Sequence, residues 1–415
     1  MNITAENIKE LPYWVINSLL ETDQYKFNMN DVVMRLFNDY TTTWCFKCRN
    51  TDVRFTPEMI AEIRRQIDHY CTLRFKKDEI EWLAKNLPWL SKGYLNHLVD
   101  WTPKREEIKI NEGYIKPYND CGLAIEATGT WLNTSMYEIA ILSIVNEVYY
   151  AFKYGLGAKN TEFQKRTIQK FEDLKNGKFN LGGFAEFGLR RRLSGEMQDW
   201  LIKYCVDQKI PGFVGTSNVY LAKKYGCKPI GTCAHEFIQC VGQATPGHDP
   251  AYSNKYAMKA WVDCFGVKNG TWLPDTVTTD CFLLDFDDRF ATLFSGVRHD
   301  SGDPIAWGEK IIAHYQKLGI DPMTKTLLFS DSLNFEKATE IKKHFEGKCK
   351  ISFGIGTFLA NDTDVPALNI VMKVTECNGR PVAKLSDVEG KGMSRDPQYV
   401  EYLKRCIEWR CVHEK

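Results

Sequence analysis

This sequence of 415 residues lacks three features that would assign it to large protein classes. No window is apolar for long enough to span a membrane, and the opening MNITAENIKELPYW has neither the basic flank nor the apolar core of a signal peptide. Neither sign of charge dominates, because 54 basic side chains are balanced by 53 acidic ones and the net charge is +1. These absences predict a cytoplasmic protein that binds neither nucleic acid nor membranes, and any anion binding has to be local.

The cysteine pattern gives little support for a metal site or for redox chemistry. Fourteen cysteines are scattered along a chain without an export signal, which predicts reduced thiols that serve mostly as small core residues. The one CxxC pair, Cys45 and Cys48, has no second pair and no histidine at zinc spacing. The alternation in TWCFKCR favours a strand there instead of a metal site.

Low-complexity linkers and internal repeats are also lacking, so domain limits have to come from changes of pattern. Residues 1–125 mix helices, near 22–38, 56–71 and 77–87, with short strands such as Thr43 to Arg49, which is typical of an α+β domain. Residues 126–370 alternate short apolar strands with amphipathic helices, and we expect an α/β fold, an irregular TIM-like (β/α) barrel. Residues 371–415, with strands near 371–375 and 381–385 and a terminal helix, are expected to return to the α+β domain.

The segment GTSNVYLAKKYGCKPIGTCAHEF, Gly215 to Phe237, is the most informative part of the chain. N-cap residue types precede VYLAKKY, Gly226 ends that helix, and the short run from Lys228 to Ile230 resembles a buried strand. The turn at Gly231 then leads into a second helix, which places His235 at a strand-to-helix junction. Active sites of α/β folds are built at such junctions, so His235 is the leading functional candidate. The alternative is a histidine that only caps or packs on a helix.

Three successive arginines follow a strand-like approach in EFGLRRRLS. Successive side chains cannot share one face, so at least one of Arg190, Arg191 and Arg192 should reach the strand end, where a guanidinium suits a phosphate. Another should be solvated or pair with a carboxylate. A solvated helix start is the alternative explanation of the whole run.

A second charged turn, RHDSGDP, follows the apolar strand ATLFSGV. Arg298 and Asp300 are two residues apart and can both face a ligand, the arginine toward an anion and the aspartate toward sugar hydroxyls. Asp303 before Pro304 is the expected N-cap of the next helix.

Two more strand ends complete the set. Asp331 follows the strand LLFS and can serve a ribose or a metal shell. Gly354 and Gly356 before Thr357 follow the strand KISF, where glycines let backbone N–H groups approach a phosphate. Together these residues describe a phosphate and sugar pocket without an evident catalytic serine or cysteine.

Eight segments, in order TDQYKFNM, EFGLRRRLS, GTSNVYLA, GTCAHEF, DTVTTDCFL, RHDSGDP, FSDSLN and FGIGT, resemble the motif series of the nicotinate phosphoribosyltransferases. The resemblance runs from about Leu19 to Asp362. It implies transfer of phosphoribosyl from 5-phosphoribosyl 1-pyrophosphate to nicotinate, coupled to ATP hydrolysis and assisted by Mg²⁺, as the salvage entry to NAD. A homodimer is one assembly that the resemblance allows, because in relatives the tyrosine matching Tyr25 can reach a neighbouring subunit's pocket.

The resemblance also implies a role for each matching residue. His235 would be phosphorylated by ATP and would act with Arg298 and Asp300 in catalysis. Nicotinate would be held by Tyr25, Phe187, Thr232 and Arg298, although core packing explains Tyr25 equally well. The phosphoribosyl group would be held by Arg190, Asp300, Asp331, Gly354, Gly356 and Thr357. The metal ligands are not identified.

Departures from the family pattern and rival functions stay open at this stage. Relatives often have glycine or asparagine at the position of Ser332 and aspartate at the position of Asn334, so a ribose or metal contact is in question. Pro274 and Val277 also depart from the family pattern, and both are packing changes. The nearest rival is nicotinamide phosphoribosyltransferase, followed by a non-catalytic homologue that binds a phosphoribosyl ligand. A barrel glycosidase with paired carboxylates, such as Asp285 and Asp288, is a third reading.

Overall fold

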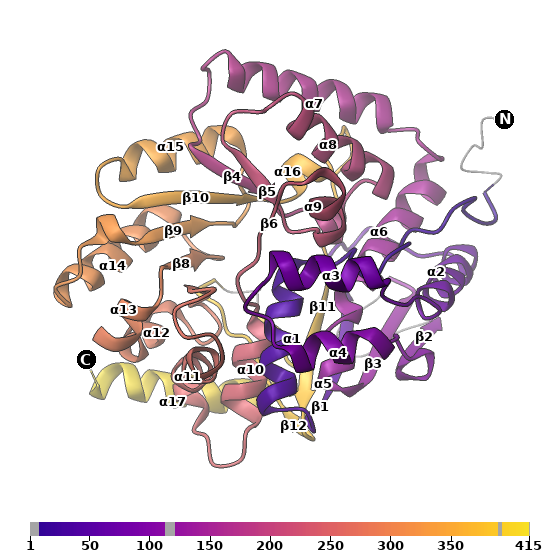
Figure 1. Ribbon diagram of the computed structural model, residues 1–415. Helices are drawn as coiled ribbons and strands as arrows, with labels where there is room; N and C mark the ends of the chain where they lie inside the picture. The colour runs from indigo at the N-terminus through magenta and orange to yellow at the C-terminus, as the bar shows by residue number, and fades with distance from the viewer. Residues whose placement is uncertain (1–7, 113–120, 389–391, 415) are drawn as a thin grey trace.

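The computed structural model describes residues 8–112, 121–388 and 392–414, so the first seven residues of the opening segment lie outside it. The strands form two separate β-sheets, and the helices surround these sheets (Figure 1). One sheet is antiparallel and the other parallel, so the chain combines an α+β region with an α/β region, as the sequence predicts.

The antiparallel sheet has the strand order β12-β11-β1-β3-β2. Its strands are β1 (Thr41–Cys48), β2 (Ile108–Glu112), β3 (Leu123–Thr130), β11 (Ile370–Cys377) and β12 (Arg380–Pro381). Trp44 of β1 lies opposite Ala127 of β3 and Val374 of β11, so a segment more than 300 residues later returns to pair with the first strand. The helices of this region are α1 (Gln24–Leu36), α2 (Pro57–Tyr70), α3 (Lys77–Asn86), α4 (Lys92–Asp100), α5 (Trp131–Thr134) and α6 (Tyr137–Tyr154).

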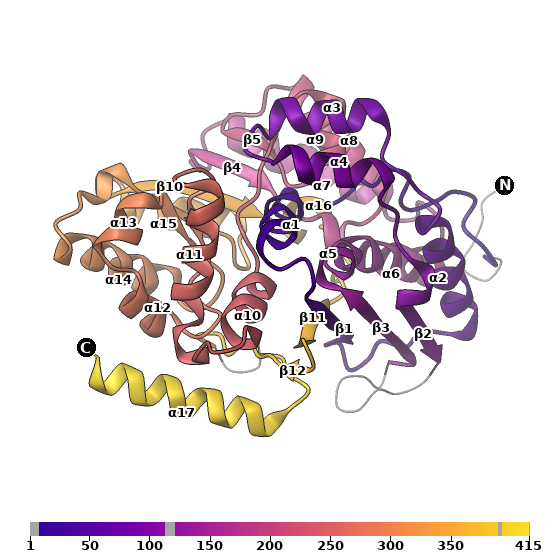
Figure 2. The same cartoon turned by 60° about the horizontal axis from the view of Figure 1, so that its bottom comes forward.

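The parallel sheet has the strand order β6-β5-β4-β10-β9-β8-β7. Its strands are β4 (Gly183–Glu186), β5 (Phe213–Thr216), β6 (Lys228–Pro229), β7 (Thr271–Trp272), β8 (Gly296–His299), β9 (Thr326–Phe329) and β10 (Lys350–Ile355). Its helices are α7 (Asn160–Lys175), α8 (Gly195–Asp207), α9 (Val219–Tyr225), α10 (His235–Ala244), α11 (Ser253–Phe265), α12 (Thr279–Asp285), α13 (Asp288–Leu293), α14 (Pro304–Lys317), α15 (Phe335–Phe345) and α16 (Thr357–Ala360). The terminal helix α17 (Pro397–His413) lies along one edge of the molecule (Figure 2).

The seven parallel strands form a curled sheet. The sequence predicts a more specific arrangement, an irregular TIM-like (β/α) barrel. Strands β6 and β7 are its two edges, and no pairing joins them within the described residues. The expected strand near 381–385 is also shorter than predicted, since β12 ends at Pro381 and Lys384 makes only an isolated bridge to Met393.

The local signals of the sequence explain several helix starts. Asn218 caps α9 by accepting from Leu221 N, and Asp303 caps α14 by accepting from Ala306 N. Gly226 ends α9 in the left-handed conformation, with φ of 66°. The CxxC pair lies in β1, and nine of the fourteen cysteines are buried, which confirms that most are core residues.

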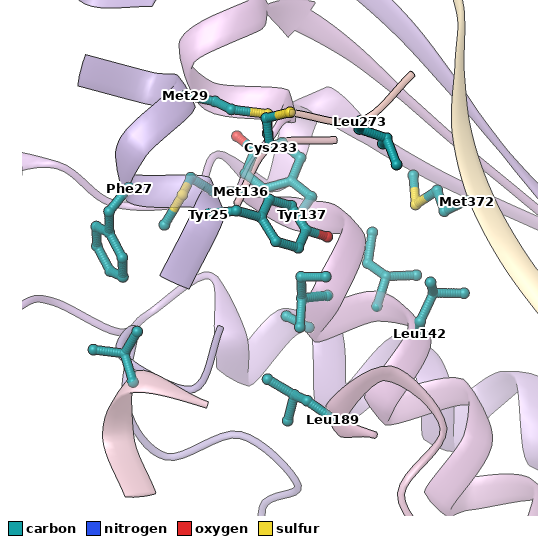
Figure 3. Close-up of a cluster of buried hydrophobic side chains, with 14 of the residues drawn as sticks. Tyr25, Phe27, Met29, Met136, Tyr137, Leu142, Leu189, Cys233, Leu273 and Met372 are labelled. Carbon is teal, nitrogen blue, oxygen red and sulfur yellow. The ribbon is translucent and has the colours of Figure 1, made fainter. Parts of the chain in front are cut away.

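The two sheets share one hydrophobic core. Figure 3 shows side chains from distant segments within one buried cluster, among them Tyr25 of α1, Leu142 of α6, Leu189 after β4 and Met372 of β11. A shared core fixes the antiparallel sheet against the ends of the parallel strands, and this junction is where the functional cavity lies. In the described part of the chain, no helix has the length and apolarity needed to cross a bilayer.

Candidate active site

A cavity of about 650 Å³ opens where the two sheets meet. Its walls come from the carboxyl ends of β4, β10, β9 and β8, which are neighbours in the parallel sheet, together with α1, α10 and β11. All predicted site residues but one line this cavity: Tyr25, Phe187, Arg190, Thr232, His235, Arg298, Asp300, Asp331, Gly356 and Thr357. The structure therefore brings together residues that are spread over more than 330 positions of the chain.

His235 is the first residue of α10 and is buried against three polar groups. Its Nδ1 lies 2.9 Å from Thr276 Oγ1, and its Nε2 lies 3.1 Å from Asp300 Oδ2 and 2.8 Å from Lys384 Nζ. Burial and the Lys384 ammonium lower the pKa of His235 to about 4, against the opposing effect of Asp275. The imidazole is therefore neutral at physiological pH and its nitrogens can act as donor and acceptor.

Lys384 and Asp275 complete this cluster and were not singled out from the sequence. Lys384 Nζ lies 3.1 Å from Asp275 Oδ2 and 3.6 Å from Asp300 Oδ2. Burial alone would raise the pKa of both carboxyls, yet Lys384 and His235 lower that of Asp275, and His235, Arg298 and Lys384 lower that of Asp300. Both aspartates are therefore ionised. Asp275 stands in the quoted segment DTVTTDCFL, but nothing in the sequence marks Lys384.

The cluster of His235, Asp275 and Asp300 has three ligand atoms close enough to hold a metal ion. The Lys384 ammonium lies within 3.6 Å of all three side chains, so it already supplies the positive charge that the two carboxylates require. We therefore assign the centre of this cluster to Lys384 and not to a metal.

Arg298 is held in place by three side chains at the end of β8. Its Nε donates to Ser330 Oγ at 2.8 Å, Nη1 to Thr232 Oγ1 at 3.2 Å and Nη2 to Asp300 Oδ1 at 3.1 Å. A guanidinium has five N–H donors, so these bonds leave one hydrogen on each terminal nitrogen for a ligand. The guanidinium carbon lies 5.9 Å from the centre of the Phe187 ring.

Tyr25 reaches the same cavity from the first turn of α1, where its side chain is 7% exposed. Gly231, in the turn before His235, makes this approach feasible, because a Cβ there would lie 2.5 Å from Tyr25 N. Tyr25 thus both packs in the core and faces the cavity of its own chain.

The three arginines after β4 separate into two environments. Arg190 and Arg191 line the cavity, and Arg190 Nη1 lies 3.4 Å from Glu138 Oε1. Arg192 is buried away from it and pairs with Glu21 at 3.0 Å. Burial, with the nearby charge of Arg190, lowers the pKa of Arg191 to about 10, still far above neutral pH. Two positive charges therefore face the cavity. The alternative explanation, that all three arginines belong to a solvated helix start, is wrong.

Gly354 does not lie with the other phosphate-loop residues among those described as lining the cavity. A Cβ at this position would come within 2.3 Å of the Phe187 ring, so Gly354 provides the space in which that ring rests. Gly356 and Thr357 do line the cavity, directly before and at the start of α16. Gly354 therefore makes room for the Phe187 ring, whereas Gly356 lies on the cavity wall.

Asn334 does not occupy a ligand position. Its side chain caps α15 by accepting from Lys337 N at 2.8 Å, a role that aspartate would fill equally well. Ser332 has φ of 50°, the left-handed backbone conformation that favours glycine or asparagine. Val277 is fully buried, consistent with a packing change.

The paired carboxylates of the glycosidase reading are not a pair in the structure. Asp285 is buried and accepts from Arg410 Nη2 at 2.7 Å, which anchors α17. Asp288 is the first residue of α13 and is exposed. A glycosidase with this pair is therefore excluded.

Comparisons with known proteins agree with this geometry. Residues 183–409 match the model of the nicotinate phosphoribosyltransferase family, and residues 20–146 match the model of its N-terminal domain. The chain belongs to this family. It is 40% identical over 407 residues to the nicotinate phosphoribosyltransferase of Citrobacter koseri, covering 95% of this chain and 96% of the relative. It is 39% identical over 395 residues to that of Ralstonia pickettii, covering 94% and 98%.

Solved structures of nicotinate phosphoribosyltransferases share the fold. The Vibrio cholerae structure superposes with a TM-score of 0.88 at 35% identity and covers 96% of this chain and 95% of its own. The Porphyromonas gingivalis structure gives 0.86 at 33% identity and covers 95% and 100%. The chain therefore has the same fold as these two solved structures.

Proposed function

We propose that this chain transfers the phosphoribosyl group of 5-phosphoribosyl 1-pyrophosphate to nicotinate and releases nicotinate mononucleotide and pyrophosphate. The observation that carries the proposal is the position of Arg298: its guanidinium carbon lies 5.9 Å from the centre of the Phe187 ring, and Asp300 contacts both Arg298 and His235. An aromatic wall next to a guanidinium suits an aromatic carboxylate.

Nicotinate would lie against Phe187 and Tyr25 with its carboxylate on Arg298. Ser330 and Thr232 hold the guanidinium by its other hydrogens, so it does not have to be ordered when the ligand binds. Nicotinamide has no charge for Arg298 to neutralise, which favours nicotinate as the base.

The phosphoribosyl pyrophosphate would occupy the rest of the cavity. Backbone N–H groups at Gly356 and Thr357 and the cations Arg190 and Arg191 supply donors for its phosphates. Asp300 is ionised and 25% exposed, so it can accept hydrogen bonds from the ribose hydroxyls. Asp331, at the end of β9, is the further acceptor on this wall.

The chemistry depends on position and charge. As the bond between C1 and pyrophosphate breaks, the ribose gains oxocarbenium character and the leaving group gains negative charge, which the two arginines stabilise. Arg298 directs the pyridine nitrogen by holding the carboxylate, which is attached to the ring carbon meta to that nitrogen.

ATP would be a co-substrate that phosphorylates His235. A neutral imidazole is the nucleophilic form, and the pKa of about 4 keeps His235 in that form at neutral pH. A phosphoryl group would place negative charge beside Arg298 and Lys384 and so change the affinity for the diphosphate substrate.

Mg²⁺ fits the wall at Asp331. Mg²⁺ is usually held by one or two carboxylates together with substrate phosphates, and Asp331 offers a carboxylate on the cavity surface. When bound, the ion would supply neutralisation of the diphosphate charge.

We propose that the parallel sheet is an irregular barrel that stays open between β6 and β7, with domain limits at 1–125, 126–370 and 371–415. The small-molecule substrates suit a cytoplasmic enzyme of NAD salvage. We also propose that the chain can form a homodimer.

Product analysis tests the function. Purified protein is given Mg²⁺ and 5-phosphoribosyl 1-pyrophosphate with nicotinate, nicotinamide or quinolinate, each with and without ATP. The proposal expects nicotinate mononucleotide from nicotinate, with faster turnover and ADP release when ATP is present. Product from nicotinamide alone would move the chain to the sister activity, and no product from any base would favour a non-catalytic phosphoribosyl-binding homologue.

A further inference from the structure

Two fully buried polar side chains, Glu186 and Gln198, lie behind the cavity and are not among the described residues that line it. Glu186 ends β4, directly before Phe187, and Gln198 belongs to α8. Glu186 Oε1 accepts from Gly188 N, and Glu186 Oε2 accepts from Gln198 Nε2 at 3.0 Å and from Thr216 Oγ1 at 2.6 Å. A buried carboxylate that accepts from three segments holds each of them in one position.

The Gln198 amide uses its other end as well. Its Oε1 accepts from Asn218 Nδ2 at 3.0 Å and from Arg192 Nη1 at 3.3 Å. Arg192 in turn donates to Glu21 Oε2 at 3.0 Å and to Val15 O at 2.8 Å, both in the segment that leads into α1. Gln198 therefore links the carboxylate at the end of β4 to the chain that precedes α1.

The backbone makes the same link a second time, through Ser217. Gln24 N donates to Ser217 O at 2.9 Å, and Ser217 N donates to Glu186 O at 2.9 Å. Tyr25 directly follows Gln24, and Phe187 directly follows Glu186. The two aromatic residues of the cavity are thus each one residue away from the same buried connection.

We propose that Glu186 and Gln198 are positioning residues that fix the separation of the Tyr25 and Phe187 rings, and with it the thickness of the slot for the base. This inference rests on the proposed binding of nicotinate between these rings. It assigns the selection of a flat ring to a hydrogen-bond network that does not touch the ligand.

Packing fixes the back of each aromatic wall, so the network decides how the walls stand to each other. The Phe187 ring rests on Gly354, where a Cβ would lie 2.3 Å from the ring, and Tyr25 N approaches Gly231, where a Cβ would lie 2.5 Å away. A flat pyridine ring gains contact with both faces only while their separation matches its thickness. Walls that can move apart would accept a puckered ring as well.

The donor and acceptor pattern of the network can be exchanged between its two central residues. Glu186→Gln alone turns an amide toward the Gln198 amide, and Gln198→Glu alone places a second carboxylate against Glu186. In the double exchange, the amide introduced at position 186 donates to the carboxylate introduced at position 198. That carboxylate can still accept from Arg192 and Asn218, so the link is restored.

Calorimetric titration of the purified chain with nicotinate, benzoate and cyclohexanecarboxylate tests the slot without turnover. Benzoate and cyclohexanecarboxylate carry the same carboxylate on a flat and on a puckered ring, so the ratio of their dissociation constants reports the thickness of the slot. Glu186→Gln, Gln198→Glu, the double exchange and Thr216→Val are compared with the unmodified chain. Thermal unfolding of the same samples measures stability.

Gln66→Glu is the matched control. Gln66 Nε2 donates to Glu62 Oε1 at 2.7 Å, and both side chains are buried on α2. Neither is among the residues described as lining the cavity. This variant therefore makes the same chemical change in a buried glutamine and glutamate pair, away from the two aromatic walls.

We expect the unmodified chain to bind benzoate about tenfold more tightly than cyclohexanecarboxylate, because its walls are already in place. Each single exchange should reduce that ratio to about twofold and weaken nicotinate about tenfold, since the walls must then be ordered on binding. The double exchange should restore the ratio. Gln66→Glu should lower the unfolding temperature and leave the ratio unchanged.

An unchanged ratio in a folded single exchange would overturn the inference, and so would a double exchange that is impaired as much as the singles. If the single exchanges do not fold, Thr216→Val decides, because it keeps the side-chain shape and removes one bond to Glu186; an unchanged ratio there overturns the inference too. An unmodified chain that binds none of the three acids would contradict the proposed function itself, whereas tight nicotinate binding with no preference for the flat ring would overturn the slot alone.

Discussion

Two buried charge clusters begin at consecutive residues of α10 and have opposite surroundings. His235 belongs to a cluster with Asp275, Asp300 and Lys384 that borders the cavity, and the Asp300 side chain is 25% exposed. Glu236 belongs to a sealed cluster in which Lys26 Nζ lies 2.5 Å from Glu236 and 2.8 Å from Glu138, all at most 4% exposed. Consecutive residues in the first turn of α10 thus belong to a cluster that borders the cavity and to a cluster that is buried away from solvent.

The sealed cluster joins three helices from distant parts of the chain. Lys26 comes from α1, Glu138 from α6 and Glu236 from α10. Glu138 also lies 3.4 Å from Arg190 and 3.7 Å from Lys373, both of which line the cavity. The comparison teaches that the same residue types can form a buried structural anchor in one place and, where one member reaches the cavity, can be available to a ligand.

The largest effect is expected for His235→Ala. Transfer of phosphoryl from ATP should be lost, because the accepting nitrogen is gone, while slow ATP-independent synthesis of nicotinate mononucleotide and the free energy of unfolding remain. Product and ADP are measured by chromatography with and without ATP. An ATP response equal to that of the unmodified chain would remove His235 from its proposed role.

Lys26→Met should act on stability. Removing Lys26 leaves the buried Glu236 carboxylate without its counter-ion and leaves Glu138 with only the more distant Arg190 and Lys373, which should lower the free energy of unfolding by about 3–5 kcal/mol. Urea unfolding followed by circular dichroism measures the loss. Adding Glu138→Gln and Glu236→Gln should recover part of it, and a loss below about 1 kcal/mol for the single variant would contradict the anchor.

Arg298→Ala should weaken one substrate more than the other. Losing a charge-assisted pair to the nicotinate carboxylate should raise the KM for nicotinate about a hundredfold, corresponding to about 2–3 kcal/mol, with a smaller change for 5-phosphoribosyl 1-pyrophosphate. Steady-state kinetics in which each substrate is varied in turn measures both values. Equal changes in the two would disprove the carboxylate contact.

The smallest effect is expected at Asn334, which lies outside both clusters. Asn334→Ala removes the cap of α15 and should cost about 1 kcal/mol of unfolding free energy, whereas Asn334→Asp should be close to neutral. Thermal unfolding of both variants, with activity assays beside it, measures this. Loss of activity in a stable Asn334→Asp variant would show a ligand role that the cap does not explain.

The sequence predicts those parts of the fold that depend on local signals. The capping residues Asn218 and Asp303, the ending glycine Gly226 and the start of α10 near His235 all follow from short patterns. The strand ends at Arg298, Asp300 and Asp331 could be found because each follows an apolar strand, and neighbouring parallel strands bring their ends together.

The parts that could not be predicted depend on long-range contacts. Lys384 is one of 54 basic residues, and only its approach to His235 across 149 positions distinguishes it. The separate fates of Arg190 and Arg192 depend on carboxylates from other segments, Glu138 and Glu21. Sheet closure likewise depends on pairing between edge strands, which no local pattern encodes.

A crystal structure of the chain with bound nicotinate would test the assigned site most directly. The account predicts the carboxylate on the terminal nitrogens of Arg298 and the pyridine ring against Phe187 and Tyr25, with its nitrogen toward the wall formed by Asp300 and Gly356. Nicotinate bound elsewhere, or in this cavity with its carboxylate directed away from Arg298, would contradict it.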